Sequence, residues 1–303
     1  MVSLIADLTV HSWNPISAQI STATNTPFQV KESHSISGGC INQTYCIADE
    51  SQRFFVKLNS ADNLDMFAAE SAGLEEIRQS AAIRVPRPIC YGHNDEMAWL
   101  VLEYLNLSQS AHGKASVLGE QLAAMHRVTS SQYGWYRDNT IGQTPQINSF
   151  SSDWIEFWRT QRLGYQLNLA QRNGFAGKLQ NLGAQLLNDL DKFFTDAPPS
   201  PSLLHGDLWS GNYDYDDSGN PVLFDAAVYY GDRETDIAMT ELFGGFPADF
   251  YSAYRYNYPL DSGYNTRKHV YNLYHILNHL NLFGSGYRHQ AEHTINTLLA
   301  EIR

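Results

Sequence analysis

The sequence is poor in cysteine. Only three cysteines, Cys40, Cys46 and Cys90, occur in 303 residues, and their spacing matches neither a CxxC pair nor a zinc-ligand pattern. Three thiols in a chain of this length are typical of a reducing compartment. The sequence therefore argues against a disulfide-stapled secreted protein, and it predicts a cytoplasmic one.

Basic residues and long apolar runs are also scarce. Lys and Arg together number 20 against 32 Asp and Glu, which gives a formal net charge of -12 with no basic run to offset it. This charge argues against nucleic acid or an anionic membrane as a partner, because both are polyanions. No apolar run approaches the ~18 residues of a membrane span, and we expect no signal peptide at the start of the chain.

The chain does contain enough apolar material for two domains. Hydrophobic residues make up 43 % of the 303 residues, so a sizeable core is expected, and neither internal repeats nor low-complexity tracts are present. The predicted class is α+β, with domains at 1–105 and 106–303. The boundary is placed where an expected strand gives way to a polar stretch.

Periodicity and turn residues predict a five-stranded antiparallel sheet with one main helix in the first domain. A leading helix with a loop is expected within 1–20, and the main helix at 62–81. The expected strands are 28–36, 41–48, 54–58, 89–93 and 97–104. From residue 114 the pattern is mostly helical, with helices expected at 151–173, 176–195, 233–243, 247–257, 267–283 and 287–302.

The most informative motif is HGDLWSGN, residues 205–212, which follows an expected strand. It places Asp207 five positions before Asn212. Kinase-like phosphotransferases use this spacing for the carboxylate that receives a hydroxyl proton and for an amide that binds a metal ion. The motif alone is moderately specific, so the rest of the chain has to support it.

A second acid, Asp225, closes the short apolar run 221–224, which is read as a strand. An aspartate at a strand end near a catalytic loop can hold the magnesium ion that bridges nucleotide phosphates. A single loop carboxylate is usually only solvated. The order of base, amide and acid favours a magnesium site made by Asn212 and Asp225.

Kinase chemistry also requires a phosphate-covering loop, a strand lysine and a helical glutamate, and candidates for all three occur in order. Gly38 and Gly39 lie in a turn between two expected strands, and Lys57 is the one cation in the apolar strand 54–58. Glu70 falls on the apolar stripe of the expected helix, where a carboxylate needs a cationic partner. The alternatives are an edge lysine and a glutamate that reaches water.

The stretch Glu103, Tyr104, Leu105 and Asn106 leaves the last expected strand of the first domain. A kinase hinge occupies this place and offers backbone groups to adenine. We therefore expect these four residues to contribute to nucleotide binding.

The motif and further runs together resemble the fructosamine kinase (ketosamine 3-kinase) family, from the aminoglycoside-phosphotransferase branch of the protein-kinase-like fold. The resemblance covers most of the chain. It is carried by HGDLWSGN, FDAAVYYGDRE from Phe224, MTELFGGF from Met239, Gly38-Gly39, Phe55-Val56-Lys57, Val85-Pro86-Arg87-Pro88, LGEQLA from Leu118 with His126, Thr144-Pro145-Gln146, Asp153-Trp154, Asn278 and Phe283-Gly284. One departure is Ala226, where the family usually has proline, which frees one backbone angle.

The resemblance implies a bilobal fold and ATP-dependent phosphorylation of a ketoamine, a deglycation repair. The acceptor would be the hydroxyl on the third carbon of a sugar condensed with an amine, and the cofactors would be ATP and Mg²⁺. In the residue-based mechanism, Asp207 accepts or orients the hydroxyl proton, and Lys57, set by Glu70, neutralises developing charge. Whether the chain is a monomer or a homodimer stays open.

Other residues near the motif receive supporting roles. Trp209 is expected to stack on the apolar face of the sugar, with a packed core tryptophan as the alternative. His205 and a group of residues after Asp225 are expected to support the catalytic loop, and one of this group is expected to structure it. The group is Asp232, Arg233, Glu234 and Asp236.

An HxxxH pair and a cysteine beside the glycine turn are weak evidence for further sites. His275 and His279 form an HxxxH pair, but the pair lacks the glutamate of a zinc protease and a third ligand. Cys40 lies beside the glycine turn, where oxidation could block the phosphate loop, although most single cysteines are inert.

The sequence is also compatible with three alternatives to a ketoamine kinase. One is another small-molecule kinase of the same fold, acting on an aminoglycoside, choline or a similar alcohol. Another is a catalytically silent nucleotide-binding protein, which the full set of candidate residues disfavours. A protein kinase is less favoured still, because the segment between Asp225 and Arg233 is too short for a substrate-binding activation segment.

Overall fold

The chain divides into two compact units in the computed structural model. The first comprises residues 1–113 and 214–224, and the second comprises 114–213 and 225–303. The structure describes residues 13–36, 41–107, 114–195 and 198–302. Residues 214–224 join the first unit although they lie about a hundred positions further along the chain, and the domain boundary at 105 stays a prediction.

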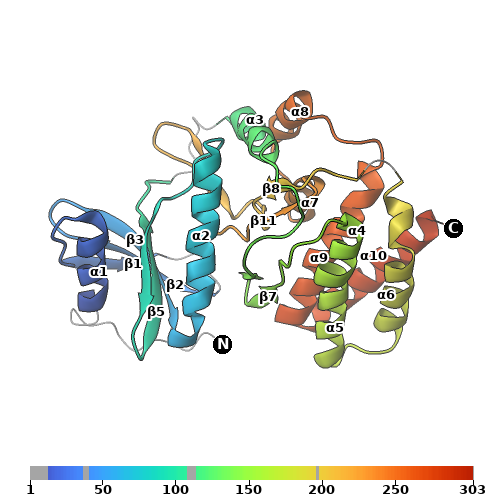
Figure 1. Cartoon of the computed structure of the whole chain (residues 1–303), viewed down its shortest axis with the longest axis horizontal. Coiled ribbons are helices and arrows are strands. Elements are labelled where there is room, and N and C mark those ends of the chain that lie inside the picture. The colour runs from blue at the N-terminus through green and yellow to red at the C-terminus, as the bar shows by residue number, and fades with distance from the viewer. Residues whose placement is uncertain (1–12, 37–40, 108–113, 196–197, 303) are drawn as a thin grey trace. The chain divides into compact units, whose positions relative to one another are not determined.

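The first unit contains the expected five-stranded antiparallel sheet, whose strand order is β1-β2-β3-β5-β4. The strands are β1 (Glu32–Ser35), β2 (Gln43–Ala48), β3 (Arg53–Ser60), β4 (Pro88–His93) and β5 (Met97–Glu103). Two helices flank the sheet, α1 (Asn14–Thr24) and α2 (Leu64–Ser80), and Figure 1 shows them on opposite sides of it. A short 3₁₀ turn, η2 (Ala61–Asn63), leads into α2.

The alternation of side chains along β3 decides which residues meet which helix. Val56 and Leu58 belong to the buried cluster that includes Trp13, Ile16 and Ile20 of the α1 side. Because successive strand residues point to opposite faces, Lys57 points to the face covered by α2. The sheet thereby carries the lysine toward the helix that bears the predicted partner.

The first strand is shorter than expected. The prediction of a strand over 28–36 was wrong at its start, because β1 begins only at Glu32 and its four residues are exposed. Phe28 and Val30 are buried nonetheless, and the ring of Phe28 packs edge-on against Phe54 at 5.0 Å. The apolar residues before β1 therefore contribute to the core without joining the ladder.

The second unit is mostly helical. Its helices are α3 (Ala115–His126), α4 (Trp154–Phe157), α5 (Tyr165–Arg172), α6 (Lys178–Asn188), α7 (Glu234–Leu242), α8 (Ala248–Asn257), α9 (Tyr264–Phe283) and α10 (Arg288–Glu301), with the 3₁₀ turns η4 (Leu190–Phe193) and η5 (Ser285–Tyr287). The helix expected over 151–173 contains a π-helical segment, η3 (Trp158–Gly164). None of the helices among the described residues is both long and apolar enough to cross a membrane.

Three pairs of short strands were less visible in the sequence, because three residues carry little periodicity. They are β6 (Asn139–Ile141) with β7 (Thr144–Gln146), β8 (Ser202–Leu204) with β11 (Tyr229–Gly231), and β9 (Tyr213–Tyr215) with β10 (Pro221–Leu223). The antiparallel pairing of β8 with β11 sets Leu204 opposite Tyr229. It brings the start of HGDLWSGN beside the segment that follows Asp225.

Candidate functional site

The predicted site residues fall in both units. Lys57, Glu70 and residues 103–106 belong to the first unit, and the HGDLWSGN loop and Asp225 belong to the second. Gly38 and Gly39, expected to cover the phosphates, lie outside the described residues together with Cys40.

Lys57 and Glu70 form the expected ion pair. Nζ of Lys57 donates a hydrogen bond to Oε1 of Glu70, and the two side chains are only 6 % and 12 % exposed. The alternative in which Glu70 reaches water is therefore wrong. A buried pair of this kind holds the ammonium group in one place, because neither partner can leave without stranding a charge.

The side chains of the expected hinge, residues 103–106, bind within the first unit. The carboxylate of Glu103 accepts a hydrogen bond from Arg84 at 3.2 Å, and the Asn106 amide donates to Asp217 at 2.9 Å. Any adenine contact from these two residues would therefore come from backbone groups, as in the hinge prediction.

A neighbouring ion pair was not foreseen from the sequence. The guanidinium of Arg84 also donates to Asp216 at 2.5 Å, across a separation of 132 residues. The other Asp216 oxygen accepts from the backbone N–H groups of Ser218 and Asn220 at 2.9 and 3.0 Å. Asp216 therefore ties the β9–β10 hairpin to the strand region of the first unit.

In the second unit, the HGDLWSGN loop closes on itself through Asn212. The Nδ2 group of Asn212 donates to the backbone oxygen of Asp207 at 2.8 Å and lies 3.3 Å from its Oδ2 atom. Asn212 is buried, so its amide is held in one orientation. The spacing of five residues thus brings the two functional groups together, as the motif predicted.

Asp207 has the electrostatics of a proton acceptor. Burial, followed by the negative charge of Asp225, raises its pKa to about 7, against the opposing hydrogen bond from Asn212. A carboxylate with a pKa near the working pH accepts a proton far more readily than an ordinary aspartate. The same shift shows that Asp207 and Asp225 are close enough to repel each other.

Asp225 adopts a left-handed backbone conformation, with φ of 60°. Aspartate tolerates this conformation better than most residues, yet it is uncommon outside glycine and clusters at functional sites. Asp225 and Asn212 offer hard oxygen donors, and the repulsion between Asp225 and Asp207 would be relieved by a divalent cation, so this pair fits magnesium. No group of three or more His, Cys, Asp or Glu arranged for metal binding occurs among the described residues, and magnesium commonly completes its shell with phosphates and water.

Asp236 is the residue of the α7 group that holds the catalytic loop. Its carboxylate accepts hydrogen bonds from the backbone N–H groups of His205 and Gly206 at 2.7 and 2.9 Å. The same carboxylate lies 3.1 Å from Nε2 of His126 on α3. From the sequence, one of four residues was expected to support the loop. All four lie at the start of the same helix, so sequence position did not distinguish Asp236 from the other three.

The other acids of the group stabilise the start of α7. Asp232 accepts from the backbone N–H of Glu234 at 2.9 Å and from the Tyr271 hydroxyl at 2.5 Å, and burial raises its pKa to about 7. Glu234 is bound by both arms of the Arg267 guanidinium, at 2.7 and 2.9 Å. These pairs anchor α7 on α9, and through α7 they support Asp236.

Trp209 is exposed at the surface of the loop, with 38 % of its area accessible, so the alternative of a packed core tryptophan is wrong. Its indole lies over Gly211, where an added Cβ would stand 2.3 Å from Cη2 of the ring. The absence of a side chain at Gly211 thus leaves room for the ring beside the loop backbone. An exposed indole in this position is available for stacking on a sugar.

The HxxxH pair is part of the packing of α9. His275 is buried, and Nδ1 of His279 donates to the His275 carbonyl oxygen at 2.8 Å, one turn earlier in the same helix. The His279 ring also packs at a tilt against Phe243, with 4.8 Å between the ring centroids. These contacts place both histidines in the packing around α9.

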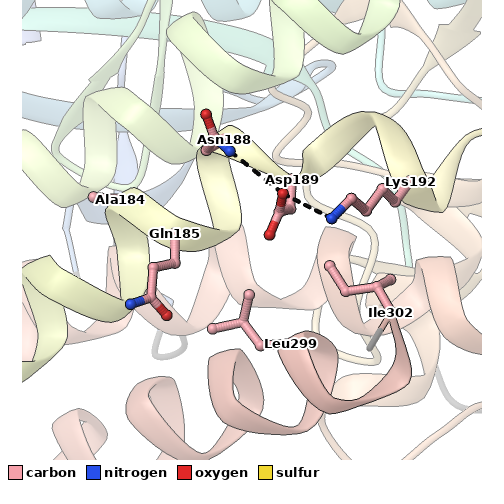
Figure 2. A pocket seen from close by; sticks show the side chains of 7 residues that line it. All are labelled: Ala184, Gln185, Asn188, Asp189, Lys192, Leu299 and Ile302. Atoms are coloured by element: carbon pink, nitrogen blue, oxygen red, sulfur yellow. Dashed lines mark hydrogen bonds and ion pairs between the residues drawn. The ribbon is translucent and has the colours of Figure 1, made fainter.

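A small surface pocket lies away from the predicted residues. Figure 2 shows it between α6 and α10, with an ion pair of 2.9 Å between Asp189 and Lys192 along its wall. None of the predicted site residues lines it.

Comparison with known proteins agrees with this geometry. The sequence profile of the fructosamine kinase family matches residues 12–301. A protein of Synechocystis sp. named "Probable ketoamine kinase" is 49 % identical over 288 residues, which covers 95 % of this chain and 97 % of the relative. A solved structure from Haemophilus somnus 129PT, assigned to the fructosamine-3-kinases, has a TM-score of 0.86 and 31 % identity and covers 94 % of this chain and 96 % of that chain.

The fold extends to more distant structures. A mutant of aminoglycoside phosphotransferase APH(4)-Ia has a TM-score of 0.63 at 15 % identity, over 94 % of this chain and 98 % of that chain, so the two share the protein-kinase-like fold. The family profile spans almost the whole sequence, including the HGDLWSGN loop at residues 205–212. This chain belongs to the fructosamine kinase family.

Proposed function

We propose that this protein is an ATP-dependent kinase that phosphorylates ketoamines on the hydroxyl of the third sugar carbon. The family and the relative named as a ketoamine kinase support the substrate class. The observation that carries the chemistry is Asp207, whose pKa is raised to about 7 beside the buried amide of Asn212. Few aspartates are so well prepared to receive a proton near neutral pH.

In the proposed mechanism, Asp207 orients the acceptor hydroxyl and takes its proton as the oxygen attacks the terminal phosphate of ATP. Asn212 and Asp225 would hold magnesium, which when bound neutralises charge on the nucleotide phosphates. The exposed indole of Trp209 would stack on the apolar face of the sugar and align the hydroxyl.

The nucleotide would be held by residues of the first unit. Lys57, fixed by Glu70, presents an ammonium group for the inner phosphates. Gly38 and Gly39 are proposed to cover the phosphates, and backbone groups of residues 103–106, including Tyr104 and Leu105, to bind adenine. With a net charge of -12, the protein depends on these few donors and on the metal ion to attract an anionic nucleotide.

The decisive test is ATP turnover with a short acceptor panel. Ribulosamine, erythrulosamine and fructosamine derivatives are compared with an amino alcohol and an aminoglycoside as controls. We expect phosphorylation of at least one ketoamine and little turnover with the controls. Turnover confined to the controls would favour the aminoglycoside or choline type of kinase, and nucleotide binding without any turnover would favour a silent protein.

A further inference from the structure

A continuous chain of buried polar groups runs from Arg233, at the start of α7, to the HGDLWSGN loop. It links Arg233, Tyr254, His126 and Asp236, whose exposed fractions are 8 %, 0 %, 0 % and 1 %. Asp236 ends the chain at the backbone of the HGDLWSGN loop. The direction of each hydrogen bond can be assigned from the chemistry of the groups.

Asp236 can only accept. Its oxygens receive two backbone N–H groups, from His205 and Gly206, and Nε2 of His126 lies 3.1 Å from the oxygen that also faces His205. Burial alone would raise the pKa of Asp236, but the hydrogen bonds from His126 and from the backbone N–H of Gly206 lower it below its usual value, so the group is a carboxylate. Nε2 of His126 must therefore carry the hydrogen.

His126 then has one lone pair to satisfy. Burial lowers its pKa although Asp236 opposes the shift, so the imidazole is neutral and Nδ1 is an acceptor. The group that meets Nδ1 is the Tyr254 hydroxyl, at 2.8 Å. Tyr254 therefore donates to His126, and this bond stabilises the tautomer that Asp236 requires.

Arg233 closes the other end. Its guanidinium donates to the Tyr254 oxygen at 3.2 Å and to the backbone oxygens of Tyr258 and Pro259 at 3.1 and 2.5 Å, and it stacks over the Tyr258 ring at 3.6 Å. A guanidinium has no acceptor atom, so the chain of donors cannot reverse. Between Arg233 and Asp236, every hydrogen points toward Asp236.

The His126 and Tyr254 side chains meet because the helices that carry them approach each other closely. Tyr254 lies on α8 and His126 on α3, 128 residues apart in sequence. An added Cβ at Gly119 of α3 would stand 2.3 Å from the Phe250 carbonyl oxygen of α8. The glycine therefore allows the two helices to approach closely enough for the Tyr254 hydroxyl to reach the imidazole.

We propose that Tyr254 is a positioning residue of the kinase: its hydroxyl, oriented by Arg233, holds His126 in the Nε2–H tautomer through which Asp236 fixes the catalytic loop. The inference rests on the proposed kinase function for its kinetic consequence. Without the hydroxyl, Nδ1 of His126 loses its donor, and the imidazole can take the other tautomer or a second proton. Asp236 then holds the two backbone N–H groups less rigidly.

The test compares Tyr254→Phe with Tyr264→Phe in the full-length protein. Tyr264 is a matched control, because it is buried in the same unit and its hydroxyl donates to Glu241 at 2.7 Å, outside the chain that ends at Asp236. For Tyr254→Phe we expect kcat to fall about tenfold with KM for ATP unchanged, a loss of about 1.4 kcal/mol. For Tyr264→Phe we expect kcat within about twofold of the parent protein.

The second readout is the ¹⁵N NMR spectrum of the imidazole of His126, assigned by its disappearance in His126→Gln. We expect the Nε2–H tautomer alone in the parent protein and in Tyr264→Phe, and a mixture or an imidazolium in Tyr254→Phe. Equal turnover in the two variants would overturn the proposal, and so would a loss of turnover with an unchanged His126 spectrum. If the parent protein phosphorylates no ketoamine, the proposed function fails, and the spectrum still decides whether Tyr254 sets the tautomer.

Discussion

Gly206 lies directly against Ala227. An added Cβ at position 206 would stand 2.1 Å from the carbonyl oxygen of Ala227, and the backbone N–H of Ala227 donates to the carbonyl oxygen of His205 at 2.8 Å. The loop that carries Asp207 and the segment that carries Asp225 are thereby locked together. Gly206 also has φ of 83°, a conformation that other residues rarely adopt.

This contact predicts that Gly206→Ala destabilises the second unit and removes activity. Gly174→Ala is the matched control, because Gly174 has φ of 91° and no atom within 4 Å of an added Cβ. We expect about 1 kcal/mol lost in the control from backbone strain, and about 2 kcal/mol more in Gly206→Ala from the clash. Urea unfolding measures both, and equal losses would show that the segment at Ala227 can move away.

Substitutions at Asp207 and Asp225 should separate turnover from nucleotide binding. We expect Asp207→Asn to keep its affinity for magnesium-ATP and to lose at least about a hundredfold in kcat, because a general base is removed. Asp225→Asn should lose the metal-dependent part of nucleotide affinity. Calorimetric titration of ATP with and without magnesium, beside steady-state kinetics, measures the two effects. Full turnover in Asp207→Asn contradicts the assignment of the base.

Because Lys57 and Glu70 form a buried pair, we expect substitution of Glu70 to reduce both stability and nucleotide affinity. Glu70→Gln removes the negative charge that Glu70 places beside the ammonium group at a site with 6 % exposure, and we expect the first unit to lose about 2 kcal/mol and KM for ATP to rise. The control is Glu50→Gln, which removes the exposed pair with Lys31, and it should leave both quantities unchanged. An equal effect of the two substitutions would argue against a special role for Glu70.

The contact between Trp209 and Gly211 offers a test of the proposal that the indole stacks on the sugar. Gly211→Ala should displace the indole, because the new Cβ would fall 2.3 Å from the ring. We expect KM for the ketoamine to rise about tenfold with KM for ATP unchanged, and Trp209→Leu to do the same. Gly286→Ala, where an added Cβ meets nothing within 4 Å, is the control. A selective rise in KM for ATP would instead place Trp209 on the nucleotide side.

His275 predicts a loss of stability in acid. Burial, followed by the charge of His279, lowers its pKa to about 3 in the folded protein, against about 6.5 in the unfolded chain. The unfolded state therefore binds the proton first, so the stability from neutral His275 is present above pH 6.5 and is lost as pH falls toward 3. At pH 5 the loss amounts to about 2 kcal/mol.

Urea unfolding at pH 7.5 and pH 5 checks this. The loss of unfolding free energy between pH 7.5 and pH 5 should be about 2 kcal/mol smaller in His275→Gln than in the parent protein. In His34→Gln, which alters an exposed side chain, this loss should equal that of the parent protein. The same pH dependence in His275→Gln as in the parent protein would assign the acid sensitivity to other groups.

The sequence correctly predicted those pairs of interacting residues that lie close together along the chain. The spacing of Asp207 and Asn212 is contained in eight residues, and the pairing of Lys57 with Glu70 follows from one strand and the next helix. The five antiparallel strands of the first unit were also predicted, but their order, in which β5 lies between β3 and β4, was not. The start of the first strand was misplaced, because buried residues such as Phe28 can pack without joining a ladder.

Within each unit, tertiary structure decided what local pattern cannot express. Asp236 was chosen from four candidate residues because only its carboxylate is aimed at the N–H groups of His205 and Gly206. The partner that sets His126, Tyr254, lies 128 residues away on another helix. The sequence by itself determined which groups are proposed to do the chemistry, since their types and spacing are local. Their orientation was decided by hydrogen bonds and close backbone contacts between distant segments, which exist only once the helices and strands have packed.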